Sequence, residues 1–296
     1  MDLGTTSALG VGTALVGVVL LALGAQLQSR GLAGVRAEDA GARRGALKLR
    51  HLARLPRSGR WVGGVLLTGA AMILNLLSLR LAPLIVVQPL GVVALITTAL
   101  LNAATNAYRL TWASIGAMAV CVVGIGTFVT VGALTARNAV VSDADLGQIL
   151  AALAVAALVL ATGLATLRRR FPATLNVLAA GVLSGFVVTL AKTVVTRVSV
   201  GNLGWLTLVG LIALVGVAVT STYFVQSAYT SGPVDLIVAG LTIIDPLVAV
   251  SLGVLVLGEA SRTPGWAIAA QSVSGVVAIA GVFLLARSHP QAIRTP

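Results

Sequence analysis

Asp245 and Pro246 are the residues in this sequence that most directly indicate chemistry. They lie at the middle of the stretch from Ser231 to Glu259, which is largely apolar and long enough for one helix to cross a bilayer. A carboxylate at that depth costs about 2.5–3.5 kcal/mol on insertion scales, so we expect Asp245 to face a bundle interior or a wet cavity. There it could bind a solute or carry a proton.

Pro246 predicts a break in this helix. Proline has no backbone N–H to donate, and it biases the preceding residue away from helical dihedral angles. We therefore expect an interruption at mid-membrane, which is where secondary transporters form their binding sites. An Asp-Pro pair is also a good N-cap and first-turn pair, so Asp245 could instead only cap the second half of the helix.

The composition identifies the class of protein around these residues. Of 296 residues, 58% are hydrophobic and 9% are charged, and the mean hydropathy is +1.03, which excludes a soluble globular domain. The net charge of +12 comes from basic residues in a few loops between apolar runs. This distribution reports membrane topology, so we expect the lipid bilayer as a partner and no nucleic acid. No basic region precedes the first apolar run, so we expect that helix to be retained rather than cleaved.

The hydropathy pattern predicts an all-α, polytopic bundle of about nine transmembrane helices. A first helix within residues 1–29 is followed by a basic loop at 30–60. Three helices within 61–131 complete a first repeat, five within 146–286 form a second, and 287–296 is a tail. Ser142 and Asp145 have the spacing of a helix-start signal. The expected spans are 7–28, 61–81, 83–104, 111–131, 146–167, 173–195, 205–229, 231–259 and 264–286.

The basic residues predict the orientation. With nine spans, fifteen of the 20 Lys and Arg residues fall on one side, nine of them in the loop at 30–60 and three at Arg168–Arg170. The positive-inside rule then places the N-terminus outside and the C-terminus in the cytoplasm, in a plasma or inner membrane. Within the loop, KLRHLARLPR could form a basic helix on anionic lipid or serve only as a solvated anchor.

Two segments of the chain share a pattern. In LAPLIVVQPLGVVALITTALLNAATN and SGPVDLIVAGLTIIDPLVAVSLGVLVLGEA, a small-Pro turn precedes an apolar helix that contains a polar-Pro pair. The pairs are Gln88-Pro89 and Asp245-Pro246, and the expected topology runs the two copies in opposite directions. That arrangement is an inverted repeat, whose paired helix breaks point to a binding site. Aligning the inner prolines places Asn102 opposite Glu259.

Some of these motifs resemble known families. The turn YFVQSAYTSGP, the mid-span proline, the ending Leu257-Gly258-Glu259 and the Gly-rich last span resemble the drug/metabolite transporter superfamily and its EamA-like permeases. The segment APLIVVQPLG, after a lone helix and a polar loop, resembles the magnesium-transporter-like branch named NIPA. The resemblance implies two inverted halves around a central cavity, alternating access and no cofactor. The first half departs from it by carrying Asn102 in place of a Gly-Glu ending, and by having one helix fewer if ten is the ancestral count.

Polar side chains within the spans are the candidates for substrate contact. Lys192 could pair with Asp245 across the cavity, or it could extend to the outer interface beside Arg197. An Asp245 without a partner would favour its neutral form and suit coupling to a proton gradient. Hydrogen bonds to a substrate, or between helices, could come from Gln88, Asn75, Gln226 and Tyr223. The pair Gly181 and Gly185 is expected to pack helices together.

These residues favour a transporter of a small organic solute, with an apolar cavity and few polar groups. Magnesium transport is the first alternative, with Asp245 as a ligand, but Mg²⁺ prefers octahedral oxygen coordination and Lys192 would oppose it. A lipid-moving protein or a scaffold is the second, and a lipid path would show a basic rim to which Arg80, Lys192 and Arg197 could contribute. Coupling to a proton or another ion gradient and a homodimer are left open.

An enzyme is not expected. The histidines, His51 and His289, lie outside the expected spans, and neither HExxH nor GxSxG occurs. No resident metal site is therefore predicted, and Cys121, as the single cysteine, excludes an intrachain disulfide.

Overall fold

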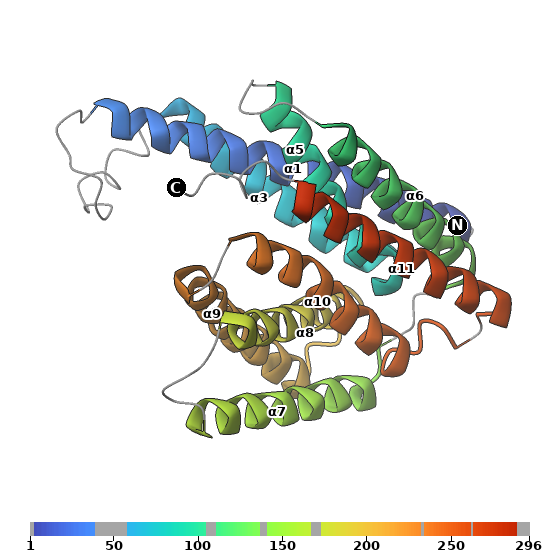
Figure 1. Ribbon diagram of the computed structural model, residues 1–296. Coiled ribbons are helices and arrows are strands. Elements are labelled where there is room, and N and C mark those ends of the chain that lie inside the picture. The colour runs from blue at the N-terminus through green and yellow to red at the C-terminus, as the bar shows by residue number, and fades with distance from the viewer. Residues whose placement is uncertain are drawn as a thin grey trace.

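A computed structural model describes residues 3–38, 58–104, 111–136, 141–166, 173–231, 234–261 and 263–288. Within these ranges the chain is helical and contains no strand, as the predicted all-α class requires (Figure 1). The predicted basic segment KLRHLARLPR, the arginine triplet Arg168–Arg170 and the turn at 232–233 lie outside the described residues.

Within the described ranges, eight helical segments are long and apolar enough to cross a membrane, so the chain is a multi-pass membrane protein. One of these segments, Leu84–Leu101, runs through α4 (Leu84–Val87) and the 3₁₀ helix η2 (Gln88–Gly91) into α5 (Val92–Ala104). The apolar part of helix α10 (Val234–Leu255), from Gly240 to Leu255, is shorter than the others. The remaining helices are α1 (Leu3–Glu38), α3 (Gly59–Leu81), α6 (Trp112–Thr135), α7 (Asp143–Thr166), α8 (Ala173–Ser199), α9 (Trp205–Ser231), α10 (Val234–Leu255) and α11 (Gly265–Ser288).

The predicted start signal at Ser142 and Asp145 is confirmed as a reciprocal cap on α7. The backbone N–H of Asp145 donates to Ser142 Oγ at 3.2 Å, and the backbone N–H of Ser142 donates to Asp145 Oδ2 at 2.8 Å. Each side chain therefore takes up an N–H that the first turn of a helix leaves without a partner. At the N-terminus of α6, Thr111 Oγ1 accepts from the N–H of Ser114 in the same way.

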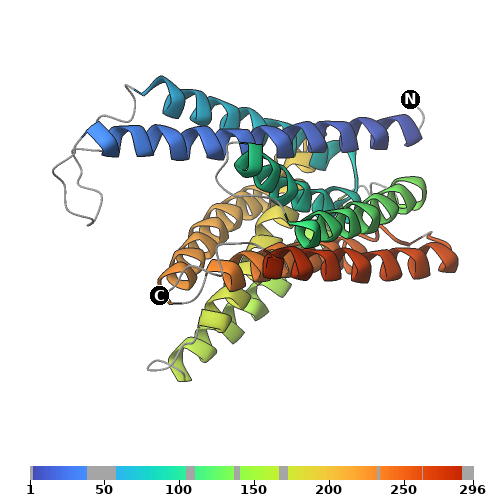
Figure 2. The ribbon, with the colours of Figure 1, turned by 45° about the horizontal axis from the view of Figure 1, so that its top comes forward.

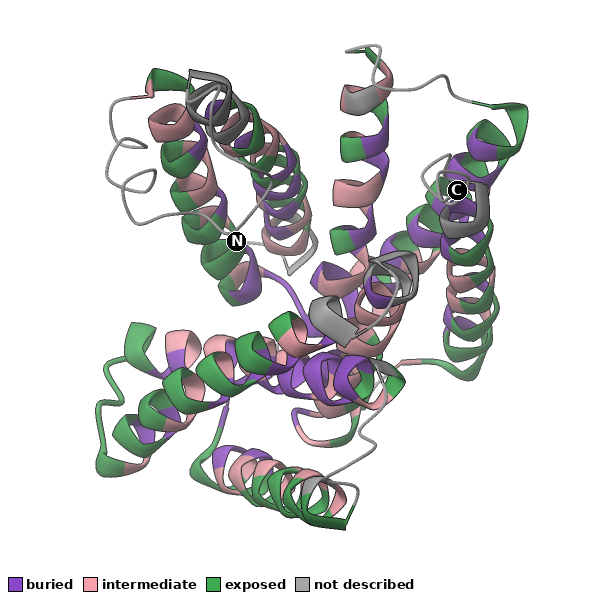
Figure 3. Ribbon diagram, turned by 60° about the vertical axis from the view of Figure 1, so that its left-hand side comes forward, coloured by how far each residue is buried: buried purple, intermediate pink, exposed green. Residues whose placement is uncertain are grey.

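The helices pack as closely contacting pairs. Figures 1 and 2 show α1 lying along α3 and α11 lying along α6, while α8 packs against both α9 and α10. Glycines permit the close approach: a Cβ on Gly24 of α1 would lie 2.9 Å from the carbonyl oxygen of Gly64 on α3. Figure 3 shows buried residues gathered at the centre of the molecule and exposed residues on its outward faces.

Gly181 and Gly185 confirm the predicted packing role on α8. A Cβ on Gly181 would lie 2.6 Å from Cβ of Ile244, and one on Gly185 would lie 2.6 Å from Cβ of Val248. Real side-chain carbons do not approach so closely, so only glycine lets α10 lie this near to α8.

A methyl group at Gly185 is expected to destabilise the fold. Gly185→Ala should lower the free energy of unfolding by about 1–3 kcal/mol, because α10 would have to move away from α8. Gly216→Ala on α9 is the matched control: a Cβ there would meet nothing within 4 Å. SDS-induced unfolding in mixed micelles measures both variants, and equal stability of the two would contradict this account of the α8–α10 contact.

The break predicted at Asp245-Pro246 is not present, because α10 runs without interruption through Pro246. Consequently Asp245 is not the N-cap of a second half-helix either. The reason is tertiary packing: Ile244 and Val248 stand on either side of the proline, and both are held against the glycines of α8. The corresponding interruption at Gln88-Pro89 is present as the 3₁₀ turn η2 between α4 and α5.

Arg197 fixes the end of α8 to its neighbours instead of extending into the interface. The residue is 1% exposed. Its Nε donates to Thr207 Oγ1 of α9 at 2.9 Å, and its Nη2 donates to Asp143 Oδ1 of α7 at 2.5 Å. One arginine thus connects three helices at this end of the bundle.

Candidate functional site

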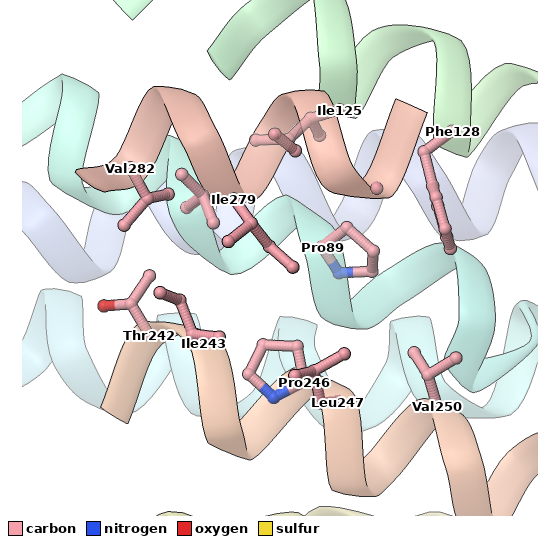
Figure 4. A pocket seen from close by; sticks show the side chains of 13 residues that line it. Pro89, Ile125, Phe128, Thr242, Ile243, Pro246, Leu247, Val250, Ile279 and Val282 are labelled. Carbon is pink, nitrogen blue, oxygen red and sulfur yellow. The ribbon is translucent and has the colours of Figure 1, made fainter. Parts of the chain in front are cut away.

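Pro89 and Pro246 lie on opposite sides of one cavity of about 130 Å³ (Figure 4). Pro89 comes from η2 and Pro246 from α10, and α6 and α11 close the other sides. The lining is apolar except for the hydroxyl of Thr242. The lining residues are Pro89, Val92, Ile125, Phe128, Thr242, Ile243, Pro246, Leu247, Val250, Gly275, Ala278, Ile279 and Val282. The structure therefore brings together the two prolines that the sequence pattern paired.

Asp245 is adjacent to this cavity in the chain but does not line it. Successive residues of an α-helix are turned by about 100°, so its side chain leaves α10 from a different face than Pro246. The residue is half-buried, and its Oδ1 is enclosed without a hydrogen-bond partner among the described residues. A buried carboxylate oxygen without a partner costs stability, so the fold alone does not explain its position.

Lys192 pairs with Glu259 and not with Asp245. Its Nζ lies 2.6 Å from Glu259 Oε1, and the two side chains are 3% and 0% exposed. The same Nζ also donates to the carbonyl oxygen of Ala82 at 3.2 Å. Lys192 therefore neither reaches the membrane interface nor faces Asp245, and both of the interactions predicted for it are replaced by this buried contact.

Glu259 also caps α4. Its Oε1 accepts the N–H of Leu84 at 2.8 Å, and its Oε2 accepts the N–H of Ile85 at 3.0 Å. Negative charge is favourable at a helix N-terminus, where the first backbone N–H groups lack partners. The turn that carries Glu259 contains Gly258 in the left-handed region, with φ of +65°, which glycine adopts without strain.

The other predicted polar residues are not brought together. Gln88 is half-buried at the start of η2, next to Pro89 but outside the cavity lining. Asn75 on α3 and Gln226 on α9 are exposed. Tyr223 is 65% exposed and packs edge-to-face against Phe224.

Several buried polar side chains were not singled out from the sequence, among them Glu259 and Gln271. Glu259 was predicted only as the end of a motif, and its alignment partner, Asn102, has a side chain outside the described set. Gln271 on α11 is 5% exposed, and its Nε2 has no partner within the described ranges. The position of Lys192 could have identified Glu259: in the expected topology both lie toward the outer end of their spans, whereas Asp245 lies at mid-membrane.

A second hollow of about 370 Å³ lies between the ends of α3 and α8. Its lining is apolar apart from Arg80 and Ser199. Lys192 and Arg197, which were expected to contribute to a basic rim, are 2% and 1% exposed and do not line it. The rim predicted for a lipid path is therefore reduced to Arg80.

The described residues define a multi-pass helical membrane protein with an apolar cavity between η2, α10, α6 and α11. The chain is similar to an uncharacterized protein of Corynebacterium glutamicum, with 27% identity over 249 residues, which cover 82% of this chain and 85% of that protein. No protein-family model matches the chain, and no solved structure is similar to it.

Proposed function

We propose that this protein is a secondary transporter of the drug/metabolite class, which moves a small organic solute across the membrane by alternating access. The observation that carries the proposal is the apolar cavity between Pro89 and Pro246, next to a helix face on which Asp245 holds a buried oxygen without a partner. A concave, mostly apolar space with few polar groups near it is the usual character of a small-molecule site.

The packing of the helices supports two inverted halves. In the first half, α1 contacts both α3 and α5, and in the second half α8 contacts both α9 and α10. The last helices of the two halves, α6 and α11, pack against each other. Counting α10 as the ninth span, the two halves would run in opposite directions, and the two prolines would occupy corresponding positions. The N-terminus is then outside and the C-terminus cytoplasmic.

The size of the cavity favours one state of a cycle. Ligand pockets generally measure about 300–1,000 Å³, which is larger than the space between the prolines. The 130 Å³ cavity therefore suits a narrowed conformation, which has room for a small solute or only for its apolar part. Asp245 would then supply the polar contact when the halves move apart.

Magnesium transport and lipid movement are less supported. Within the described ranges, no group of three or more His, Cys, Asp or Glu side chains lies together. Asp245 is therefore the carboxylate on which a magnesium path would depend. A lipid path would depend on the hollow beside Arg80, which is the one basic residue among the described residues that line it.

A solute screen in reconstituted vesicles tests the proposal. We expect flux of at least one small organic solute, measured with and without a proton gradient and with Mg²⁺ as a separate arm. Mg²⁺ flux independent of the proton gradient, without organic-solute flux, would instead favour the magnesium alternative. Lipid scrambling in the same vesicles would favour the other.

Filling the cavity is expected to block that flux. Gly275 lines the cavity, and a Cβ there would make ordinary contact with Phe128 at 3.5 Å, so Gly275→Leu should place its side chain in the open space. We expect flux to fall at least about tenfold with the fold retained. The control is Gly126→Leu on the exposed face of α6, where a Cβ would meet nothing within 4 Å. Equal flux in the two variants would show that the cavity is not on the path.

A further inference from the structure

Lys192 and Glu259 bind one short turn of the chain through its backbone carbonyl and N–H groups. The Lys192 ammonium binds the carbonyl of Ala82, and the Glu259 carboxylate binds the N–H groups of Leu84 and Ile85. The turn belongs to the N-terminal half of the chain, whereas both charged residues belong to the C-terminal half. We call this arrangement the clasp: Lys192, Glu259 and the turn at residues 82–85.

We propose that the clasp closes this end of the bundle, that it positions Pro89 at the cavity, and that it must release for this end to open. The release of the clasp during a transport cycle rests on the proposed transport function. The contacts that form the clasp do not depend on that proposal.

The positioning role follows from the shortness of α4. This helix has four residues, and its backbone bonds at the start are those of Val86 and Val87 to the carbonyl of Pro83. The N–H groups of Leu84 and Ile85 are instead bound by Glu259. Since α4 continues directly into η2, the position of Pro89 depends on how the start of α4 is held.

The sealing role follows from burial. Ala82, Leu84 and Val86 are all 0% exposed. Gly253 of α10 lies directly against the carboxylate, because a Cβ there would be 2.8 Å from Glu259 Oε2 and 3.2 Å from Cβ of Leu84. The two halves therefore meet here without space for water, so a solute could pass this end only if the charged pair lets the turn move.

A buried cysteine on α4 can report that movement. In a Cys121→Ala background, Val86→Cys places a thiol of similar size at a 0% exposed position against α6. In lipid nanodiscs, where a charged methanethiosulfonate reagent reaches both faces, this thiol is expected to react slowly while Glu259 is intact. Glu259→Gln is expected to raise its labelling rate at least about tenfold, because the turn then lacks its ionic hold.

The native Cys121 is the matched control. It is 0% exposed between α6 and α11, away from the clasp, and we expect it to stay protected in a Glu259→Gln chain without the other substitutions. Faster labelling at position 86 alone supports the clasp. Unchanged labelling at position 86, or equal exposure of both cysteines, overturns it, since equal exposure would mean general loosening.

A conservative variant guards against loss of the fold. Glu259→Asp keeps the charge but is one methylene shorter, and it is expected to give a labelling rate between those of Glu259 and Glu259→Gln. A rate as slow as that of the Glu259 protein would overturn the inference. The labelling experiment requires no solute, so it tests the clasp independently of transport. Absence of flux in every vesicle assay would refute the transport proposal, and the labelling rates would still test the clasp.

Discussion

Replacing Glu259 with alanine is expected to lower the free energy of unfolding by about 3–5 kcal/mol, because breaking a buried ion pair leaves an uncompensated charge. The charge left behind is that of Lys192, whose side chain is 3% exposed. The substitution also removes the acceptor of the N–H groups of Leu84 and Ile85, so the start of α4 loses its cap. SDS-induced unfolding in mixed micelles, followed by tryptophan fluorescence, measures the loss.

The double variant Lys192→Met with Glu259→Gln tests the cause of that loss. It removes both charges at similar side-chain volume, and the glutamine oxygen can still accept one of the two backbone N–H groups. Buried ion pairs replaced by well-packed neutral side chains often cost little, so we expect most of the stability to return. A double variant as unstable as Glu259→Ala would mean that the charge of Lys192 is not what makes the single substitution costly.

The positions of the helices could be predicted from the sequence. The starts of α8 at Ala173 and α9 at Trp205 agree with the expected spans, and α6 begins one residue after its predicted start. Long apolar runs separated by polar loops are a local signal, because a chain in a bilayer must satisfy its backbone hydrogen bonds within each span. The end of α1 could not be predicted from hydropathy, because the helix continues past the apolar run to Glu38.

The course of α10 could not be predicted, because it depends on contacts far away in the sequence. A proline lowers helix stability locally, and the pattern around Pro246 therefore favoured a break. Gly181 and Gly185 hold α10 on both sides of the proline, more than 60 residues earlier in the chain. Those glycines were correctly predicted to pack helices, but the sequence does not indicate which helix packs against them.

The partner of Lys192 was missed for a related reason. Asp245 is the conspicuous acid within an apolar run, whereas Glu259 follows the end of α10 and resembles an ordinary loop residue. Glu259 is buried because the turn that carries it folds back against α4, where two backbone N–H groups need an acceptor. Burial of a loop residue is a property of the packed bundle and has no signature in hydropathy.

Replacing Asp245 with asparagine is expected to abolish transport and to stabilise the protein. Oδ1 of Asp245 is enclosed without a partner among the described residues, so the carboxyl group contributes an unpaired buried polar atom to the resting fold. Removing its charge should raise the free energy of unfolding by about 1 kcal/mol, because the desolvation cost of a charged group is lost. Flux in vesicles should fall to background, since the carboxylate proposed to bind the solute is then gone. Asp245→Ala should do the same while still inserting into the membrane.

These opposite signs separate a functional carboxylate from a structural one, because functional sites commonly reduce stability. Asp245→Glu keeps the charge and is expected to retain part of the flux. Ser251→Ala is the control on the same helix: the residue is exposed, and among the described residues its hydroxyl bonds to the carbonyl of Leu247, so both flux and stability should be unchanged. If Asp245→Asn transports as well as the native chain, Asp245 is not on the path. If it loses stability and flux together, the side chain supports the fold, and the solute site must be sought elsewhere around the cavity between Pro89 and Pro246.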